Sequence, residues 1–134
     1  MRKDPVFFIA DDDPDDQELF IKALKEINDQ CFCITAFNGE EALDRLLDEK
    51  NTPPDLIFLD LNMPRKNGKQ CLKEIKLHKI IQDIPVIIYS TSVNPLEKER
   101  CLELGAHSYI IKPVSFKESV DTAHLFMTFC RETA

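Results

Sequence analysis

The sequence lacks the features that would indicate a membrane protein or a general nucleic-acid-binding surface. No apolar run approaches the roughly 18 residues that a transmembrane helix needs. The run Val6–Ala10 is too short for a signal peptide and stops at an aspartate. With 24 acidic and 17 basic residues, the net charge of −7 argues against nucleic-acid binding through overall basicity. These absences predict a cytoplasmic chain with neither a nucleic-acid nor a membrane partner.

Paired metal-binding spacings of cysteine and histidine are also missing. The cysteines are odd in number and scattered, and the three histidines supply no second ligand pair. Small buried apolar side chains in a reducing compartment explain such cysteines best. The cysteines are Cys31, Cys33, Cys71, Cys101 and Cys130.

Short apolar runs alternate with amphipathic segments along the chain, without repeats or long linkers. Val6–Ala10, Leu56–Leu59 and Val86–Tyr89 are continuous apolar runs, and Cys31–Ile34 and Tyr109–Ile111 are shorter ones. Runs without polar alternation are typical of strands buried on both faces of a parallel sheet.

A helical pattern follows each run. Asn38 with Glu41, and Ser115 with Glu118, have the spacing of helix-capping pairs, and Pro95 and Gly105 bracket a further helix. Five strands, each followed by a helix and joined by right-handed crossovers, predict an α/β fold. We expect a flavodoxin-like (βα)₅ three-layer sandwich with parallel strand order 2-1-3-4-5.

The last predicted helix carries more aromatic residues than one core-facing stripe needs. Phe116, Val120, Ala123 and Met127 fall on one stripe, whereas Leu125, Phe126 and Phe129 fall on a neighbouring face. Those three residues are either additional core or an exposed patch for self-association.

Acidic residues stand where the first and third predicted strands end. Asp11 and Asp12 follow the first strand, and Asp60 follows the third, which is its neighbour in this topology. Carboxylates brought this close must be protonated or bind a cation, and hard oxygen ligands favour Mg²⁺. Asp13, Asp15 and Asp16 suit solvated positions at a helix N-terminus.

The fourth and fifth strands end at Ser90 and Lys112, on the same edge of the sheet. A hydroxyl donor and a fixed cation beside a metal–carboxylate site suit a phosphoryl group. Lys112 also suits a plain ion pair with Asp60, and the two roles are compatible.

These motifs together resemble the receiver domain of bacterial two-component response regulators. The matching segments are Asp11-Asp12, Asp60-Leu61-Asn62-Met63-Pro64 with Gly68, Ser90-Thr91 and Lys112-Pro113. The resemblance covers nearly the whole chain, and it implies a single receiver domain over residues 1–134 without an effector domain. The acidic run over residues 11–16 also resembles stand-alone receivers that include partners of bacterial phytochrome kinases.

The resemblance implies a phosphorylation site with bound Mg²⁺. Asp60 would be the phosphoacceptor, Asp12 would bind the metal directly, and Asp11 would act nearby, largely through water. The backbone carbonyl of Asn62 would complete the metal ligands.

The resemblance also implies how the phosphoryl group is sensed. Ser90 and Lys112 would contact its oxygens, Tyr109 would be the aromatic switch, and Asn62 and Ser92 would tune the lifetime of the phosphorylated state. The Lys112–Pro113 bond would be cis.

The function implied is that of a phosphoacceptor in a histidine–aspartate phosphorelay. A sensor histidine kinase or phosphotransfer protein would phosphorylate Asp60. The weakly apolar fourth helix, with the fifth strand and fifth helix, would then bind a downstream protein or a second copy of the chain. The alternative is a degenerate receiver that serves as a binding or scaffold module without phosphorylation.

Two other readings fit the residues poorly. A dehalogenase-type phosphatase needs a second acid two positions after its nucleophile, where this chain has Asn62, so no enzyme acting on external substrates is expected. A flavodoxin would bind phosphate at the first loop, where Asp11 and Asp12 repel it.

Overall fold

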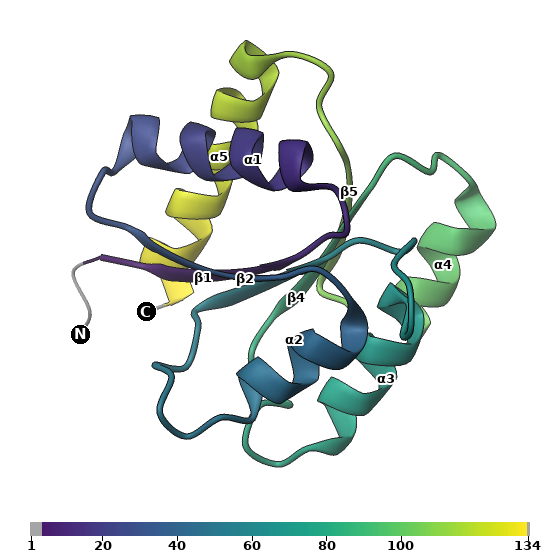
Figure 1. Cartoon of the computed structure of the whole chain (residues 1–134). Coiled ribbons are helices and arrows are strands. Elements are labelled where there is room, and N and C mark those ends of the chain that lie inside the picture. The colour runs from purple at the N-terminus through teal and green to yellow at the C-terminus, as the bar shows by residue number, and fades with distance from the viewer. Residues whose placement is uncertain (1–3, 134) are drawn as a thin grey trace.

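The computed structural model describes residues 4–133, in which helices cover both faces of a five-stranded parallel sheet (Figure 1). The strand order is β2-β1-β3-β4-β5, so the predicted topology is confirmed. The elements in chain order are β1 (Val6–Ala10), α1 (Pro14–Ile27), β2 (Phe32–Ala36), α2 (Gly39–Leu46), β3 (Leu56–Leu59), α3 (Gly68–Leu77), β4 (Val86–Ser90), α4 (Pro95–Glu103), β5 (Ser108–Ile111) and α5 (Phe116–Thr133).

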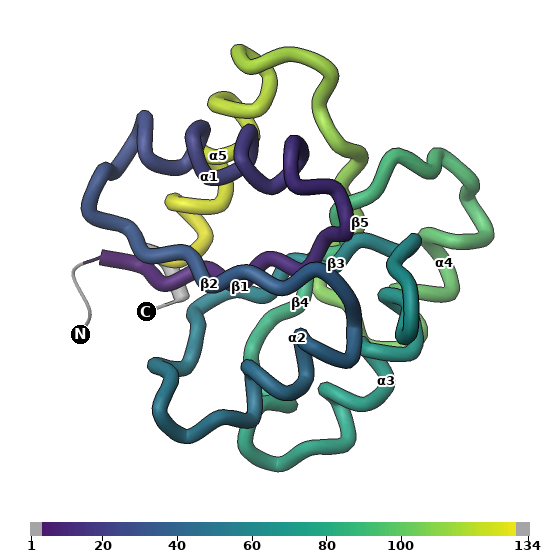
Figure 2. Tube along the Cα trace, viewed as in Figure 1, coloured from purple at the N-terminus to yellow at the C-terminus, as the bar shows by residue number. Residues whose placement is uncertain are grey.

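The strand register brings the ends of β1 and β3 to one level. Ala10, the last residue of β1, lies opposite Ala36 of β2 and Leu59 of β3. The tube in Figure 2 shows how the chain leaves β1 through α1, forms β2 at one edge, and returns past β1 to β3. The residues that follow β1 and β3 are therefore neighbours at the carboxyl edge of the sheet.

Each face of the sheet has its own hydrophobic core. Helices α1 and α5 cover one face, and α2, α3 and α4 cover the other (Figure 1). The first face holds an aromatic cluster in which the ring of Phe58 lies 4.6 Å from that of Phe126 and 4.7 Å from that of Phe20. This packing fixes α1 and α5 against the central strands.

The apolar runs differ in burial between the centre and the edges of the sheet. Every residue of β1, β3 and β4 is buried, as the continuous runs predict. In β2 the side chain of Phe32 is 59% exposed, and in β5 that of Ile111 is also exposed. These strands are at the two edges, where neighbouring helices cover less of the sheet, so burial on both faces was wrong for them.

The two extra aromatic residues of helix α5, Phe126 and Phe129, belong to the hydrophobic core and do not form an exposed patch. Phe126 is buried in the aromatic core, and the ring of Phe129 lies 4.6 Å from that of His107. Leu125 is 64% exposed. The expectation that Phe116 belongs to the core stripe is wrong, because this residue lies in the first turn and is 42% exposed.

Asparagine side chains cap three of the helices. Asn38 accepts the N–H of Glu41 at 2.8 Å, as predicted, and Asn67 forms a capping box with Gln70 that the sequence analysis missed. Ser115 accepts the N–H of Glu118 at 3.1 Å, and Asn94 caps α4. These bonds satisfy amide groups that helix geometry leaves without a partner.

The cysteine side chains behave as small apolar groups. Cys31, Cys71, Cys101 and Cys130 are buried, and Cys33 is half-buried. Burial raises the pKa of Cys33 and of Cys71 to about 12, so these thiols stay protonated at neutral pH. None of the helices described within residues 4–133 is both long and apolar enough to cross a bilayer.

Candidate functional site

Three carboxylates converge where β1 and β3 end. Asp11 and Asp12 follow β1, Asp60 follows β3, and one carboxylate oxygen of each lies within 4.8 Å of the others. Asp11 and Asp60 are buried, whereas Asp12 is exposed. The predicted acidic cluster is therefore present in the structure.

Backbone hydrogen bonds hold the two buried aspartates in place. The N–H of Asp11 donates to the carbonyl of Ala36, and that of Asp60 donates to the carbonyl of Ala10, both at 3.0 Å. The buried amide of Gln17 in α1 adds two more bonds, to the carbonyl oxygens of Asp11 at 2.8 Å and Ala36 at 2.7 Å. Sequence reasoning missed Gln17, although it lies three residues before the buried Phe20 and so shares its helix face.

The ammonium group of Lys112 lies among three carboxylates. Its Nζ donates to Oδ2 of Asp11 at 2.6 Å, of Asp16 at 2.9 Å and of Asp60 at 3.1 Å. The predicted ion pair with Asp60 is thus present, together with two others. The expectation that Asp16 is merely solvated is wrong, because its position in the first turn of α1 directs it toward the end of β5. Asp13 does have the expected role, since it caps α1 by accepting the N–H groups of Asp15 and Asp16.

Burial and neighbouring charges shift the pKa values of Asp11 and Lys112. Burial, the largest effect, raises the pKa of Asp11 from 3.8 to about 6, although hydrogen bonds from Lys112 and from the N–H of Asp13 oppose it. Burial alone would lower the pKa of Lys112, but its bonds to Asp11 and Asp16 and the charge of Asp60 outweigh that effect and raise it. Lys112 therefore stays charged, and Asp11 is ionised only above mildly acidic pH.

The donor set suits a hard divalent cation. Asp11, Asp12 and Asp60 bring three carboxylates together, and Asp16 shares the ammonium of Lys112 with Asp11 and Asp60. One ammonium leaves an excess of negative charge, and oxygen ligands at this spacing are those that Mg²⁺ prefers. The acidic pocket is thus fitted to hold a metal ion.

A second set of contacts links the ends of β4 and β5. Ser90 is fully buried, and its Oγ accepts the N–H of Ser92 at 3.2 Å. Tyr109 is buried, and its hydroxyl donates to the carbonyl of Ser92 at 2.8 Å. The backbone of Ser92 therefore connects the predicted phosphate-sensing hydroxyl to the predicted aromatic switch.

The loop after Asp60 passes very close to α3. The N–H of Gly68 donates to the carbonyl of Leu61 at 3.1 Å, and a Cβ at Gly68 would lie 2.2 Å from the carbonyl oxygen of Asp60. Only glycine fits here. The exposed Asn62 follows two residues after Asp60, and its N–H lies 3.4 Å from Oδ1 of Asp60.

The expected cis bond between Lys112 and Pro113 is wrong for this structure. All peptide bonds among the described residues, 4–133, are trans. The N–H of Lys112 donates to the carbonyl of Ser90 at 2.9 Å, so continued pairing with β4 positions Lys112 at the carboxyl edge.

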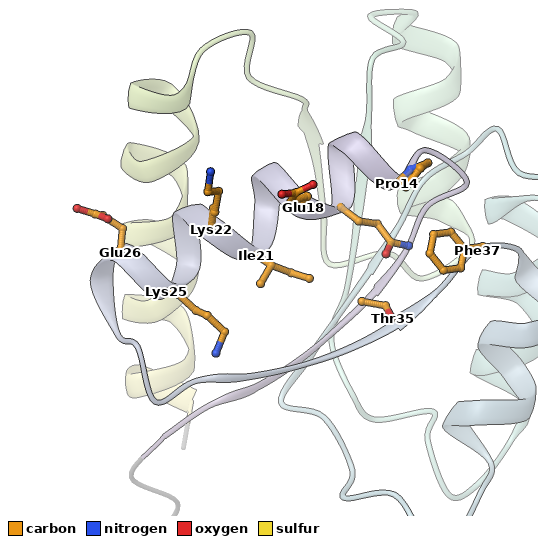
Figure 3. A pocket seen from close by; sticks show the side chains of 9 residues that line it. Pro14, Glu18, Ile21, Lys22, Lys25, Glu26, Thr35 and Phe37 are labelled. Atoms are coloured by element: carbon orange, nitrogen blue, oxygen red, sulfur yellow. The ribbon is translucent and has the colours of Figure 1, made fainter.

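A separate groove of about 570 Å³ runs between α1 and β2 (Figure 3). Its charged lining residues are two acids and two bases, Glu18, Lys22, Lys25 and Glu26, so it favours neither anions nor cations. Thr35 and Phe37 line it from the side of β2. The acidic cluster, and not this groove, therefore has the chemistry for a metal or phosphoryl group.

The parallel sheet carries aspartates, a serine hydroxyl and a lysine ammonium group at its carboxyl edge, which is the arrangement of a phosphorelay receiver domain. Residues 7–124 match the response regulator receiver domain. The chain belongs to this family, whose members are signalling modules of two-component systems.

Several solved structures are similar over almost the whole chain. The phosphorylated cyanobacterial phytochrome response regulator RcpA has a TM-score of 0.87 and 30% identity, over 98% of this chain and 96% of RcpA. The Mn²⁺-bound form of response regulator Rcp1 has a TM-score of 0.84 and 29% identity, over 97% and 96% of the two chains.

Longer relatives contain the same domain. The transcriptional regulatory protein BaeR of Escherichia coli is 30% identical over 127 residues, which are 95% of this chain and 50% of BaeR. The chain spans about half the length of such curated relatives.

Proposed function

We propose that Asp60 accepts a phosphoryl group from a phosphohistidine of a sensor kinase or phosphotransfer protein. A carboxylate oxygen of Asp60 forms a bond to phosphorus while the phosphorus–nitrogen bond of the donor breaks, and that nitrogen keeps the electron pair. The observation that carries the proposal is the convergence of Asp11, Asp12 and Asp60, with the ammonium of Lys112 bonded to Asp11 and Asp60. The exchange takes place in the cytoplasm, as the sequence predicts.

Mg²⁺ supplies positive charge for the transferred group when it is bound. Asp11, Asp12 and Asp60 would hold it together with the backbone carbonyl of Asn62. The excess of carboxylates over ammonium groups supports this assignment, since a cation relieves their repulsion.

The residues of β4 and β5 would bind the phosphoryl oxygens. Lys112 already donates to Oδ2 of Asp60, so it has only to transfer that donor to an oxygen on the new phosphoryl group. Ser90 accepts a hydrogen bond from Ser92, which leaves its own hydroxyl proton free to donate. Both groups would thus stabilise charge that forms during transfer.

The signal would leave through the face made by α4, β5 and α5. Movement of Ser90 toward the phosphoryl group would shift the backbone of Ser92 and with it Tyr109, because the N–H of Ser92 bonds Ser90 and its carbonyl accepts from Tyr109. Of the residues of α4, only Cys101 is buried, so few apolar contacts resist a shift of this helix. Asn62 and Ser92 flank the site and would tune the lifetime of the phosphorylated state.

The similar proteins support proposals for the metal ion, the phosphoryl donor and the protein partner of this chain. RcpA is a phosphorylated phytochrome response regulator and Rcp1 binds Mn²⁺, which supports phosphorylation and a divalent ion at the matching site here. We propose that residues 1–134 act as one receiver unit, that the donor is a kinase of the phytochrome type, and that output is contact with another protein or a second copy. Turnover of external substrates is not part of this function, and complete occupation of the site by competent groups disfavours the scaffold alternative.

Substitution of the acceptor tests the proposal. Wild-type protein incubated with Mg²⁺ and acetyl phosphate should gain one acid-stable phosphoryl group, measured by intact mass, whereas Asp60→Asn should gain none. Asp44→Asn, which changes an exposed residue of α2, is the matched control and should be labelled normally. Labelling of Asp60→Asn at the wild-type level overturns the proposal.

A further inference from the structure

Asp16 is a fourth carboxylate at the site and comes from a different element than the other three. It is the third residue of α1, after the cap at Asp13, and its side chain is 38% exposed. Its Oδ2 lies 2.9 Å from Nζ of Lys112, across 96 residues of sequence. The contact therefore joins α1 to the residue that directly follows β5.

The ammonium group of Lys112 has three protons, and each has a carboxylate acceptor in the structure. The acceptors are Asp11, Asp16 and Asp60. Asp11 and Asp60 belong to the group of three acids suited to a cation, and Asp16 does not. Under the proposed function, Asp11 and Asp60 would also bind the cation or the phosphoryl group, whereas Asp16 would contact only Lys112.

We propose that Asp16 is the positioning residue of Lys112, which holds the ammonium at the carboxyl edge while Asp11 and Asp60 engage a cation and a phosphoryl group. This inference rests on the proposed function. Without Asp16, Lys112 keeps only partners that those ligands compete for, so its ammonium is less well fixed when the phosphoryl group arrives. Asp16 itself touches no reacting atom.

Phosphorylation kinetics in two variants separate this role from a simple change of charge. Asp16→Asn removes the ionic bond, and Asp15→Asn removes the same charge one residue earlier in α1, where the side chain is exposed and is not one of the three acceptors of Lys112. Replacing the Asp16 carboxylate with a neutral amide weakens its hydrogen bond to the ammonium and should lower the maximal rate of labelling by acetyl phosphate with Mg²⁺ by about tenfold. The acetyl phosphate concentration giving half the maximal rate should stay within about twofold, because the ammonium acts on the group in transfer. Asp15→Asn should match the wild type, and Asp16→Glu, which restores the charge, should recover most of the rate.

A second measurement does not depend on phosphorylation. The ammonium protons of Lys112, observed by ¹H–¹⁵N NMR without Mg²⁺, should exchange with water several times faster in Asp16→Asn than in wild-type protein or Asp15→Asn. If the wild-type protein takes up no label, the proposed function is overturned. The proton-exchange measurement still tests the contact between Asp16 and Lys112 in that case. Normal labelling kinetics or unchanged exchange in Asp16→Asn overturns the positioning role alone.

Discussion

Replacement of Asp11 by asparagine should stabilise the metal-free protein at neutral pH. Asp11 is 1% exposed, and burial raises its pKa from 3.8 to about 6. An acid whose pKa is higher in the folded than in the unfolded state contributes most stability below its unfolded pKa, and that contribution is lost as the pH rises through the folded value. The charged form of Asp11 is therefore a cost above about pH 6, which asparagine avoids while keeping an oxygen for Lys112.

The magnitude follows from the size of the shift. A rise from 3.8 to about 6 corresponds to about 3 kcal/mol between the protonated and the charged form, at 1.36 kcal/mol for each pKa unit. At pH 4, where folded Asp11 is largely protonated, the variant and the wild type should have similar free energies of unfolding. At pH 7.5 the variant should be more stable by about 3 kcal/mol.

Urea unfolding in EDTA across this pH range measures the difference directly. Asp44→Asn is again the matched control, because it removes the same charge from an exposed residue of α2. Addition of Mg²⁺ should stabilise the wild type more than Asp11→Asn and so reduce the gap. A stability difference that stays constant from pH 4 to pH 7.5 would refute the reasoning.

Two further substitutions test the surroundings of the site. Gly68→Ala should destabilise the protein by about 3 kcal/mol in urea unfolding, because the new Cβ would lie 2.2 Å from the backbone oxygen of Asp60; wild-type stability would contradict the close approach. Lys69→Ala should change the free energy of unfolding by less than about 1 kcal/mol but speed amide hydrogen exchange in α4, since Nζ of Lys69 bonds Glu97 of that helix at 3.0 Å. The control Lys73→Ala alters another charge on α3 and should leave α4 exchange unchanged; equal effects of the two variants would exclude the ion pair as a restraint.

Much of the fold was predictable because local hydrophobic patterns in the sequence indicate the strands and helices. The continuous runs at Val6–Ala10, Leu56–Leu59 and Val86–Tyr89 became the buried central strands. The edge strands were read less well, since a short apolar run does not tell whether a helix covers both of its faces. The exposure of Phe32 is the result.

The site was predictable to the extent that topology alone determines it. Asp11 and Asp60 meet because β1 and β3 are neighbours, and Lys112 joins them because β5 ends at the same edge. Asp16 was misjudged because its contact depends on the rotational orientation of α1, which determines whether Asp16 faces Lys112. Gln17 was missed because its two hydrogen bonds go to backbone carbonyl groups. Every residue has such a group, so the sequence does not indicate which carbonyls accept these bonds.

The charge of the cluster explains why the proposed ligands depend on one another. Asp11, Asp16 and Asp60 share one ammonium, Asp12 adds a fourth carboxylate beside two of them, and phosphorylation of Asp60 would replace its single negative charge with about two on the phosphoryl group. Lys112 cannot balance these charges alone, because its three donors are already engaged with Asp11, Asp16 and Asp60. A cation held by Asp11, Asp12 and Asp60 would take up two of the three acceptors of Lys112, and the donors of Lys112 would then be available to the phosphoryl oxygens. Lys112 would thus be released for the phosphoryl group only when a cation neutralises part of the site, and the proposed role of its bond to Asp16 is to keep the ammonium within reach.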